Sequence, residues 1–461
     1  MIPGVYGKES FSMDYRDALR YLYSFLNFEA KTDYVYREDF HLKRVRWLLR
    51  AFGNPQKKLR FVLVGGTKGK GSTACILASI LSSAGYRPGL YTSPHLNDVR
   101  ERIRIGGVLI PKKDFAAIFR KIRIRLTRGA PPSFGAFTFF EVLTVAAILY
   151  FFSRKADPVI LEVGLGGRLD ATNAVDPLVS VLTPVSYDHM DKLGRSLLEI
   201  AGEKKAIMRE KGFLICARQP ASVGALLKEW ACRRKVEAFF SGRDFRSRAD
   251  CLTEFGSSFG VRSGKKRLRH LFLPLAGKYQ IENAACAVQA AEVLALRRGF
   301  RIGESAIRKG LLNASWDGRF QILHRYPPVI ADGAHNGASM RALRESLRAI
   351  FPGRPVTVIL GISNDKDLPR ILRELILLRP ERIFATQAGN VRAMPAPVLA
   401  GKIAARLPRV RSVFNLKEAM DDAMRNKAGR HLVLITGSLF LVGEALNFWN
   451  SRSGCSGTAE P

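Results

Sequence analysis

The sequence is short of acidic residues. It contains 40 Asp and Glu against 74 Lys and Arg, which gives a formal net charge of +34. A field of this sign favours anionic partners such as nucleotides, polycarboxylates or nucleic acid. The basic residues are dispersed and are not interleaved with aromatic ones, so a solvated basic surface is the simpler explanation of the excess.

Cysteine is also scarce, and no secretory leader is expected from the first residues. The six cysteines form no C-x-x-C pair and show no metal-ligand spacing with histidine, which argues against a zinc site and a disulfide framework. Single thiols of this kind are typical of a reducing compartment. The first residues, "MIPGVYGKESFSMDYRD", lack the apolar core of a signal peptide. We therefore expect a cytoplasmic protein.

Long uninterrupted apolar segments are missing too. The longest run, residues 134–152, carries Glu141 near its middle. A carboxylate in lipid is costly, so this run predicts a buried helix and no contact with a membrane.

What the chain does contain is a repeated rhythm of apolar strand, polar loop and amphipathic helix. With 461 residues, two domains are expected. Continuous apolar strands between helices predict a parallel sheet covered on both faces. The strands expected in the first domain span residues 61–64, 89–92, 159–163, 178–183 and 213–216.

The rhythm restarts after "SWDGRF", and we place a domain boundary there. The predicted fold is α/β, with an N-terminal P-loop ATPase domain over residues 1–316 and a smaller C-terminal Rossmann-like domain over residues 317–450. Residues 451–461 read as a disordered tail. The basic stretch 241–269 is expected to form a hairpin or a loop excursion, with no role that we can assign.

The stretch "FVLVGGTKGKGST" follows the strand–glycine loop–helix order that a phosphate site needs. It departs from a standard P-loop, because Val64 stands where the first glycine belongs and Gly71 separates Lys70 from Ser72. It also fits part of a dinucleotide fingerprint. That fingerprint requires an acidic residue at the end of the second strand, where this chain has Ser93. A phosphate cradle that binds ATP through Lys70 is therefore the better interpretation.

Polar side chains follow each of the next expected strands, where functional groups of open α/β sheets gather, and three more (Glu203, Lys204 and Lys205) lie on the helix that comes after them. In chain order they are Ser93, His95, Glu162, Asp170, Asn173, Asp188, His189, Asp191, Glu203, Lys204 and Lys205. Hard oxygen ligands beside phosphates suit Mg²⁺. Taken singly, Glu162 could instead cap a helix or pair with an arginine, and His189 could be a structural histidine. Their co-location favours a shared site.

At this point the chain resembles the folylpolyglutamate synthase/dihydrofolate synthase family of the Mur ligase superfamily. The resemblance spans residues 15–450 and rests on "GTKGKGS", "YTSPHL", "ERI", "LEVGLGGRLDATN", "DHMDKLG", "EKKAI", "NAACA", "WDGRF", "DGAHN", "NDKD" and "TGSL", all in the family's order. It implies an ATP-dependent ligase that joins L-glutamate to a folate or to dihydropteroate through an acyl phosphate, with release of ADP and phosphate. It also implies that ATP and substrate lie between the two domains.

The resemblance implies a role for individual residues. The ATP contacts would be Thr67, Lys68, Gly69, Lys70, Gly71, Ser72, Asn283, Arg319 and Asp332. The Mg²⁺ ligands would be Ser93, Glu162 and His189. The substrate contacts would be Thr138, Phe139, Phe140, Glu141, Leu169, Asp170 and Ala171. The catalytic residues would be Lys70, Lys204 and His335, with Lys204 carbamylated.

The chain departs from the family at two places. Lys68 replaces a common asparagine, and "EKKAI" replaces "EKAGI", so that Lys205 and Ala206 are the altered neighbours of Lys204. Two other functions stay open: a Mur-type ligase that acts on cell-wall precursors, and a nucleic-acid-stimulated ATPase, for which charge alone is weak support. We expect a monomer that acts on small molecules and does not bind nucleic acid.

Overall fold

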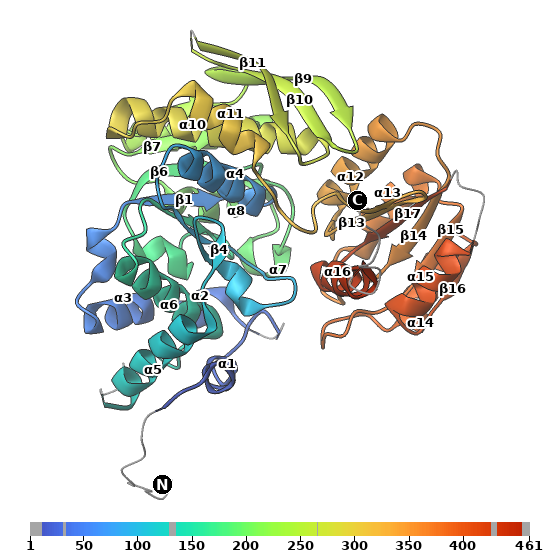
Figure 1. The fold of residues 1–461 in the computed structure, drawn as a ribbon, viewed down its shortest axis with the longest axis horizontal. Helices are drawn as coiled ribbons and strands as arrows, with labels where there is room; N and C mark the ends of the chain where they lie inside the picture. The colour runs from blue at the N-terminus through green and yellow to red at the C-terminus, as the bar shows by residue number, and fades with distance from the viewer. Residues whose placement is uncertain (1–11, 31–33, 129–134, 265, 426–430, 454–461) are drawn as a thin grey trace, which may run out of the picture.

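The computed structural model describes residues 12–30, 34–128, 135–264, 266–425 and 431–453 (Figure 1). The N-terminal part is built on an eight-stranded sheet of order β4-β3-β2-β5-β1-β6-β7-β8. Its strands are β1 (Phe61–Gly65), β2 (Gly89–Tyr91), β3 (Ile103–Ile105), β4 (Val108–Leu109), β5 (Val159–Glu162), β6 (Pro177–Leu182), β7 (Phe213–Cys216) and β8 (Glu237–Phe240). All but β3 and β4 pair in parallel. The mostly parallel sheet and the five expected strands are confirmed, whereas β3, β4 and β8 were not anticipated.

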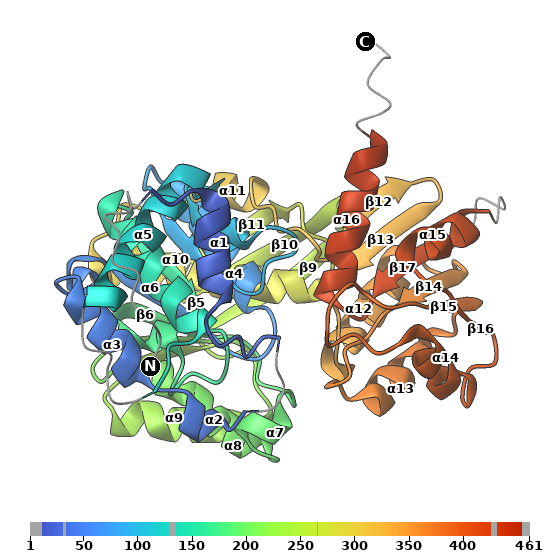
Figure 2. The same ribbon diagram turned by 90° about the horizontal axis from the view of Figure 1, so that it is seen from below.

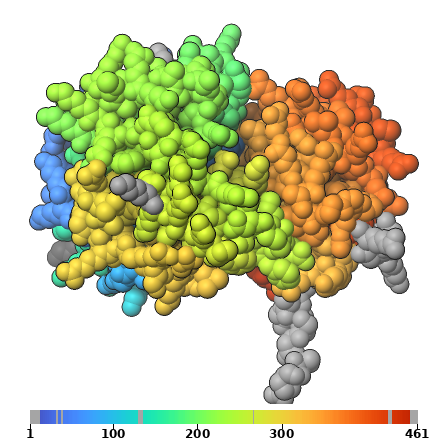
Figure 3. Space-filling view, turned by 90° about the horizontal axis from the view of Figure 1, so that it is seen from above, coloured from blue at the N-terminus to red at the C-terminus, as the bar shows by residue number. Residues whose placement is uncertain are grey.

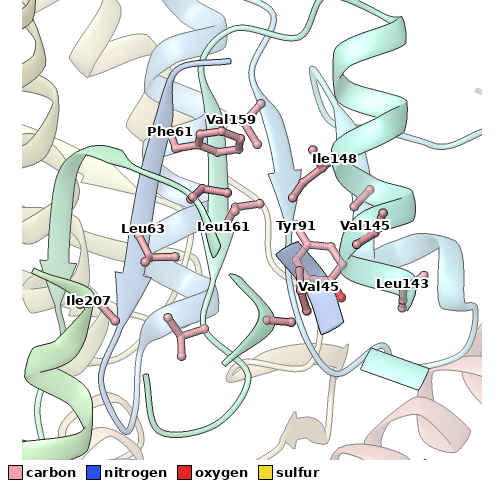
Figure 4. Close-up of a cluster of buried hydrophobic side chains, with 14 of the residues drawn as sticks. Val45, Phe61, Leu63, Tyr91, Leu143, Val145, Ile148, Val159, Leu161 and Ile207 are labelled. Carbon is pink, nitrogen blue, oxygen red and sulfur yellow. The ribbon is translucent and has the colours of Figure 1, made fainter. Parts of the chain in front are cut away.

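Helices cover both faces of this sheet, which explains why its strands are apolar without alternation. The helices on the first face are α1 (Tyr15–Tyr23), α3 (Leu42–Ala51), α5 (Lys112–Arg128), α6 (Phe139–Ser153), α8 (Leu197–Lys204) and α9 (Ala221–Arg233). Figure 4 shows Phe61, Leu63 and Leu161 of the sheet in the same cluster of buried side chains as Val145 and Ile148 of α6. The second face is covered by α4 (Lys70–Ser83), α10 (Lys278–Arg298) and α11 (Glu304–Leu312). Two short helices, α2 (Tyr36–Asp39) and α7 (Met190–Leu193), lie in the connections that precede α3 and follow β6.

The longest apolar run of the sequence is α6, a buried helix as predicted. Its one carboxylate, Glu141, accepts hydrogen bonds from Arg44 Nε at 3.0 and 2.9 Å and from the backbone N–H of Thr138 at 2.9 Å. Both side chains of the Arg44–Glu141 pair are about 95% buried, with 4% and 5% exposed. The charge inside the apolar run is therefore paired and also closes the capping box at the start of α6. None of the helices in the described ranges combines the length and apolarity that a membrane crossing demands.

Removing one partner of this ion pair should destabilise the protein strongly. Arg44→Met leaves the Glu141 carboxylate buried without its cation, and we expect the free energy of unfolding to fall by about 3–5 kcal/mol. The measurement is urea unfolding followed by circular dichroism. The double variant Arg44→Met/Glu141→Gln keeps the cap but removes the charge, so it should recover much of that loss. A single variant as stable as the wild type would contradict the pairing.

A separate three-stranded antiparallel sheet, of order β11-β10-β9, occupies most of the stretch expected as a hairpin or loop. Its strands are β9 (Phe245–Thr253), β10 (Gly256–Ser263) and β11 (Lys266–Leu273). Phe245, Phe259 and Leu271 are buried toward α10, while Arg248 and Arg262 face solvent. Of the two expected forms, the hairpin is the one that the structure contains, extended by a third strand, and the loop is wrong because the frequent arginines obscured an alternating strand pattern.

The β9–β10 turn reaches the C-terminal part of the chain. The guanidinium of Arg325 lies 4.7 Å from the ring centroid of Phe255. In Figure 3 the yellow-green surface of this sheet adjoins the orange C-terminal lobe. The three-stranded sheet thus contributes one of the contacts between the two lobes.

The C-terminal lobe holds a six-stranded sheet of order β12-β13-β17-β14-β15-β16, parallel except for β12. Its strands are β12 (Gln321–Arg325), β13 (Pro328–Asp332), β14 (Val356–Leu360), β15 (Arg382–Ala385), β16 (Val410–Ser412) and β17 (Leu432–Thr436). One face packs on α12 (Gly337–Ile350), α13 (Leu368–Leu378) and α14 (Ala396–Ala404), and the other on α15 (Leu416–Met424) and α16 (Leu439–Ser453). The Rossmann-like expectation is confirmed.

The disordered tail predicted from residue 451 begins too early, because α16 continues through Ser453. The rest of that predicted tail, residues 454–461, lies outside the described residues.

Candidate active site

The glycine loop lies between β1 and α4, as the strand–loop–helix order predicts. Gly66 and Gly69 have φ of +130° and +84°, which favour glycine. A Cβ at Gly69 would lie 2.2 Å from Asn283 Oδ1, so the loop fits against α10 only without a side chain there. The first hydrogen bond of α4 runs from Thr73 N to Gly69 O. The preceding N–H groups of the helix therefore remain available to an anion.

Lys70 opens α4 and folds back over this loop. Its Nζ donates to Thr67 O at 3.3 Å. The Lys70 charge also acts on two buried groups, the Glu162 carboxylate and the Lys204 amine. The predicted phosphate lysine thus lies at the centre of the charged groups of the site.

Glu162 and Ser93 are neighbours because β5 and β2 pair in parallel and end at the same edge. Ser93 N donates to Glu162 Oε2 at 3.0 Å, and a Cβ at Gly71 would lie 3.2 Å from the same oxygen. Glu162 is 4% exposed. Burial raises its pKa, although Lys70 opposes the shift. A buried carboxylate beside a hydroxyl, next to a phosphate-binding loop, is a suitable donor set for Mg²⁺.

His189 follows β6 and is the N-cap of α7, with a φ of +48°. Its Nε2 lies 3.9 Å from Asp188 Oδ1. Desolvation lowers the pKa of His189 to about 4, and the cations Lys366 and Lys68 add to that shift. The imidazole is therefore neutral at pH 7 and able to bind a metal.

The predicted Mg²⁺ ligands are only partly assembled. Within the described residues, no group of three or more His, Cys, Asp and Glu side chains is close enough to hold a metal. The structure places Ser93 against Glu162, whereas His189 contacts Asp188. Since Mg²⁺ commonly takes few protein ligands and completes its shell with water and phosphate oxygens, the assignment stays a prediction.

Lys204 ends α8 beneath the glycine loop and is 5% exposed. Its Nζ donates to Gly66 O at 2.9 Å. Burial lowers the pKa of Lys204 to about 7, and the nearby Lys70 charge contributes to the shift. Lys205 points elsewhere, with its Nζ 4.6 Å from the ring centroid of Trp230 on α9. The altered neighbour in "EKKAI" therefore does not crowd the Lys204 amine.

A polar bridge joins the two lobes. Lys68 Nζ lies 2.9 Å from Asp188 Oδ2 and 2.9 Å from His335 Nε2, and Asn336 Nδ2 donates to Asp188 Oδ2 at 3.1 Å. His335 Nδ1 donates to Gly333 O at 2.7 Å, so its Nε2 accepts from the lysine. Burial, with Lys68 and Lys366, lowers the pKa of His335 well below its usual value. We call Lys68, Asp188, His335 and Asn336 the interlobe bridge.

The remaining predicted ATP contacts gather at the same junction. Asp332 accepts from Phe320 N at 2.8 Å, Ala334 N at 2.9 Å and Tyr279 Oη at 3.1 Å. Burial raises the pKa of this carboxyl, while Arg319 nearby opposes the shift. The Arg319 charge also acts on Glu162 in the other lobe. The structure thus gathers residues from both lobes around the glycine loop.

The predicted substrate contacts have mostly structural partners here. Thr138 caps α6, and Glu141 is held by Arg44. Asp170 is 1% exposed and accepts from Leu165 N at 2.8 Å and Thr172 N at 3.0 Å. Phe139 and Ala171 are also buried. Only Phe140 and Leu169 are partly exposed, so the contact of this set with a substrate stays a prediction.

Sequence reasoning missed two residues that act on the candidate histidines, namely Arg102 and Lys366. Arg102, which is 1% exposed, donates from Nε to His95 Nδ1 at 2.8 Å and from Nη1 to Glu29 Oε1 at 2.7 Å. Burial, with the Arg102 charge, lowers the pKa of His95 to about 4. The "ERI" motif pointed to Arg102, but nothing in it pointed to Glu29. Likewise "NDKD" contains Lys366, whose charge reaches His335 and His189, yet the motif suggested no role for it.

Comparison with known proteins gives a consistent result. The Mur ligase middle domain family matches residues 64–291, and the dihydrofolate synthetase C-terminal domain family matches residues 320–448. The chain is 32% identical over 445 residues to the dihydrofolate synthase/folylpolyglutamate synthase of Bacillus subtilis (strain 168), covering 93% of this chain and 98% of that protein.

Solved structures agree with these matches. The crystal structure of folylpolyglutamate synthase from Thermotoga maritima superposes with a TM-score of 0.81 at 32% identity, covering 95% of this chain and 97% of that one. Mycobacterium tuberculosis folylpolyglutamate synthase complexed with ADP gives a TM-score of 0.83 at 30% identity, covering 94% and 99%.

Proposed function

The chain belongs to the folylpolyglutamate synthase/dihydrofolate synthase family, and from this premise we propose how its own residues carry out the reaction. It is an ATP-dependent acid–amino acid ligase that adds glutamate to folates. One observation supports our assignment of roles above all. The free N-terminus of α4, the buried Glu162 carboxylate and the buried Lys204 amine meet at the junction of the two lobes.

The first step needs a cradle for phosphates. A carboxylate is a poor acyl donor, because oxide would have to leave, so the substrate carboxylate first takes the γ-phosphoryl group of ATP. The loop of residues 67–72 holds the β- and γ-phosphates through the N–H groups of residues 68–72, since the Thr67 N–H donates to Pro184 O, and the Lys70 ammonium offsets charge on the transferring group. Asn283, Arg319 and Asp332 position the nucleotide. The amine of glutamate then attacks the acyl phosphate and releases phosphate.

The second requirement is the exclusion of water, which would hydrolyse the acyl phosphate. Residues of both lobes surround the glycine loop, and the interlobe bridge draws the lobes together there. We propose that Phe140 and Leu169 contact the pterin end of the substrate, since they are the partly exposed members of the predicted set.

Magnesium fits the residues present. Ser93, Glu162 and His189 would hold it, since Glu162 is a buried carboxylate and His189 is neutral. When bound, Mg²⁺ supplies positive charge that offsets the charge of the phosphates. A carbamate on Lys204 is proposed on similar grounds, because a buried amine with a pKa of about 7 is largely neutral and nucleophilic at physiological pH.

Removing the charge of Glu162 should raise the Mg²⁺ requirement. Glu162→Gln keeps an acceptor for Ser93 N but loses the anion, so we expect activity to fall about tenfold or more. Calorimetry of ADP binding, with and without Mg²⁺, should show that the metal no longer strengthens binding. Glu304→Gln, an exposed change on α11, is the control. An unchanged Mg²⁺ dependence in Glu162→Gln would refute the ligand assignment.

The identity of the substrate that accepts glutamate is tested by direct assay. Product formation that depends on ATP and glutamate is measured separately with dihydropteroate and with tetrahydrofolate. We propose that the chain acts on one or both of them as a cytoplasmic monomer, with a domain boundary at residues 316/317. Turnover with neither acceptor, but with a cell-wall precursor, would favour the other Mur-type ligase.

A further inference from the structure

A large cavity lies apart from the glycine loop, on the flank of the N-terminal lobe. Its volume is about 740 Å³. Its walls are α3, the 3-10 helix Pro55–Lys58, the loop between β5 and β6, and the turn that follows α8. In both ribbon views α3 lies on the side turned away from the C-terminal lobe (Figures 1 and 2). The cavity, which we call the flank cavity, is therefore not part of the interlobe junction.

The flank cavity is lined by cations with little compensation. Five of its lining residues are basic: Arg46, Arg50, Lys57, Arg168 and Arg209. Its one acidic lining residue, Asp176, has a 99% exposed side chain and lies 3.3 Å from Arg209. Arg168 lies 3.4 Å from Glu203 Oε2 but is 57% exposed. In each pair one partner is largely exposed to water, which weakens the pairing.

The three basic residues on the opposite wall have no acidic partner. Within the described part of the chain, no carboxylate lies within ion-pair distance of Arg46, Arg50 or Lys57. Desolvation and the Arg46 charge also lower the pKa of Arg209, although Asp176 acts in the opposite direction. A concave space lined by charges of one sign raises the local concentration of ions of the opposite sign.

The inner wall of the flank cavity is the reverse side of two loops of the candidate active site. Arg209 Nη2 donates to Asn173 Oδ1 at 2.9 Å and to Val175 O at 2.7 Å, and Nη1 donates to Ala206 O at 3.2 Å. Asn173 follows Asp170 in one loop, and Ala206 follows Lys204 in the other. Because Ile207 O, Asn173 O and Asp176 engage the remaining donors of Arg209, an anion in the cavity would be bound by the other four cations and would act on this scaffold through the charge of Arg209.

We propose that the flank cavity binds the oligo-γ-glutamate tail of a folylpolyglutamate. The proposal rests on the proposed function, which makes products that gain one carboxylate with each added glutamate. A single small anion would occupy only part of a cavity of this size, whereas ligands of several linked groups fill volumes of about 300–1,000 Å³. Arginine forks bind carboxylates in bidentate fashion, so several forks suit a chain of them.

The test uses the full chain and penta-γ-glutamate without a pterin. Its binding is measured by calorimetry for the wild type and for Arg46→Glu/Arg50→Glu, two exposed positions on one helix. We expect at least tenfold weaker binding in this variant. The matched control is Arg248→Glu/Arg262→Glu on the solvent face of the β9–β11 sheet, which changes the net charge equally and should leave binding intact.

Inorganic tripolyphosphate separates a carboxylate site from a phosphate site. Tighter binding of the γ-glutamyl peptide supports the proposal, and tighter binding of tripolyphosphate overturns it. Absence of peptide binding to the wild type, or equal loss in both variants, also overturns it.

Glutamate addition to a monoglutamyl folate is measured in parallel. This reaction should persist in Arg46→Glu/Arg50→Glu, and its loss would place the flank cavity within the catalytic machinery and overturn the proposal. A wild type that binds the peptide but adds glutamate to no folate would refute the proposed function and leave the binding site supported.

Discussion

Replacing Lys70 with alanine should lower kcat by about 10²–10³-fold, the scale expected when one preorganised charge on a transition state is removed. Lys70 lies at the start of α4, and within the described residues its side chain makes one hydrogen bond, from Nζ to Thr67 O at 3.3 Å. The loss of this side chain should therefore lower the free energy of unfolding by less than about 1 kcal/mol. The measurement is ADP release at saturating substrates.

The variant Lys68→Ala is the control that separates a specific role of Lys70 from the general effect of removing one positive charge from the loop. Lys68→Ala removes a cation from the same loop, but that cation is paired with Asp188 and His335. We expect Lys68→Ala to lose less activity than Lys70→Ala and to lose interlobe contact as well. Turnover by Lys70→Ala within a few-fold of the wild type would show that the phosphate cradle is wrongly assigned.

Replacing Lys204 with alanine should lower activity about 10²-fold or more, and short carboxylates should restore part of it. The reason is the proposed carbamate, which turns a buried cation into an anion beside the phosphate loop. Acetate added to Lys204→Ala can occupy the vacated position. Lys205→Ala is the matched control, since Lys205 lies against Trp230 and should retain activity without rescue.

The carbamate also predicts a spectroscopic signal and a pH dependence. In ¹³C-bicarbonate, the wild type should show a carbamate carbon resonance that disappears in Lys204→Ala and persists in Lys205→Ala. Only the neutral amine captures carbon dioxide. Because the pKa of Lys204 is lowered to about 7, the neutral form prevails above pH 7, and the signal should fade as the pH drops below it. A signal that survives in Lys204→Ala would refute the assignment.

The architecture was readable from the sequence because its determinants are local. Strands buried on both faces are continuous apolar runs, as Phe61 to Val64 illustrate, and each ends in a loop at the same edge of the sheet. That rule alone placed Ser93 beside Glu162. The glycine loop was likewise recognisable, since Gly66 and Gly69 adopt conformations that favour glycine.

What the sequence could not supply are pairings over long separations. Lys68 and His335 are 267 positions apart, and Arg102 and Glu29 are 73 apart. Such contacts depend on how the lobes and loops pack, which no local pattern encodes. Glu141 illustrates the same limit, since its position suggested a substrate contact while its carboxylate is engaged by Arg44, 97 positions away.

The interlobe bridge has a consequence for the order in which ligands arrive. Lys68 belongs to the glycine loop and also holds Asp188 and His335, so phosphates bound there in the proposed way would compete with the contact between the lobes for its ammonium. Thermodynamic linkage makes the effect reciprocal. If the bound nucleotide lowers the equilibrium constant for lobe association by some factor, lobe association lowers the affinity for the nucleotide by the same factor. In such a molecule ATP binds most readily to the parted form, and the later substrates must supply the free energy that brings the lobes back together.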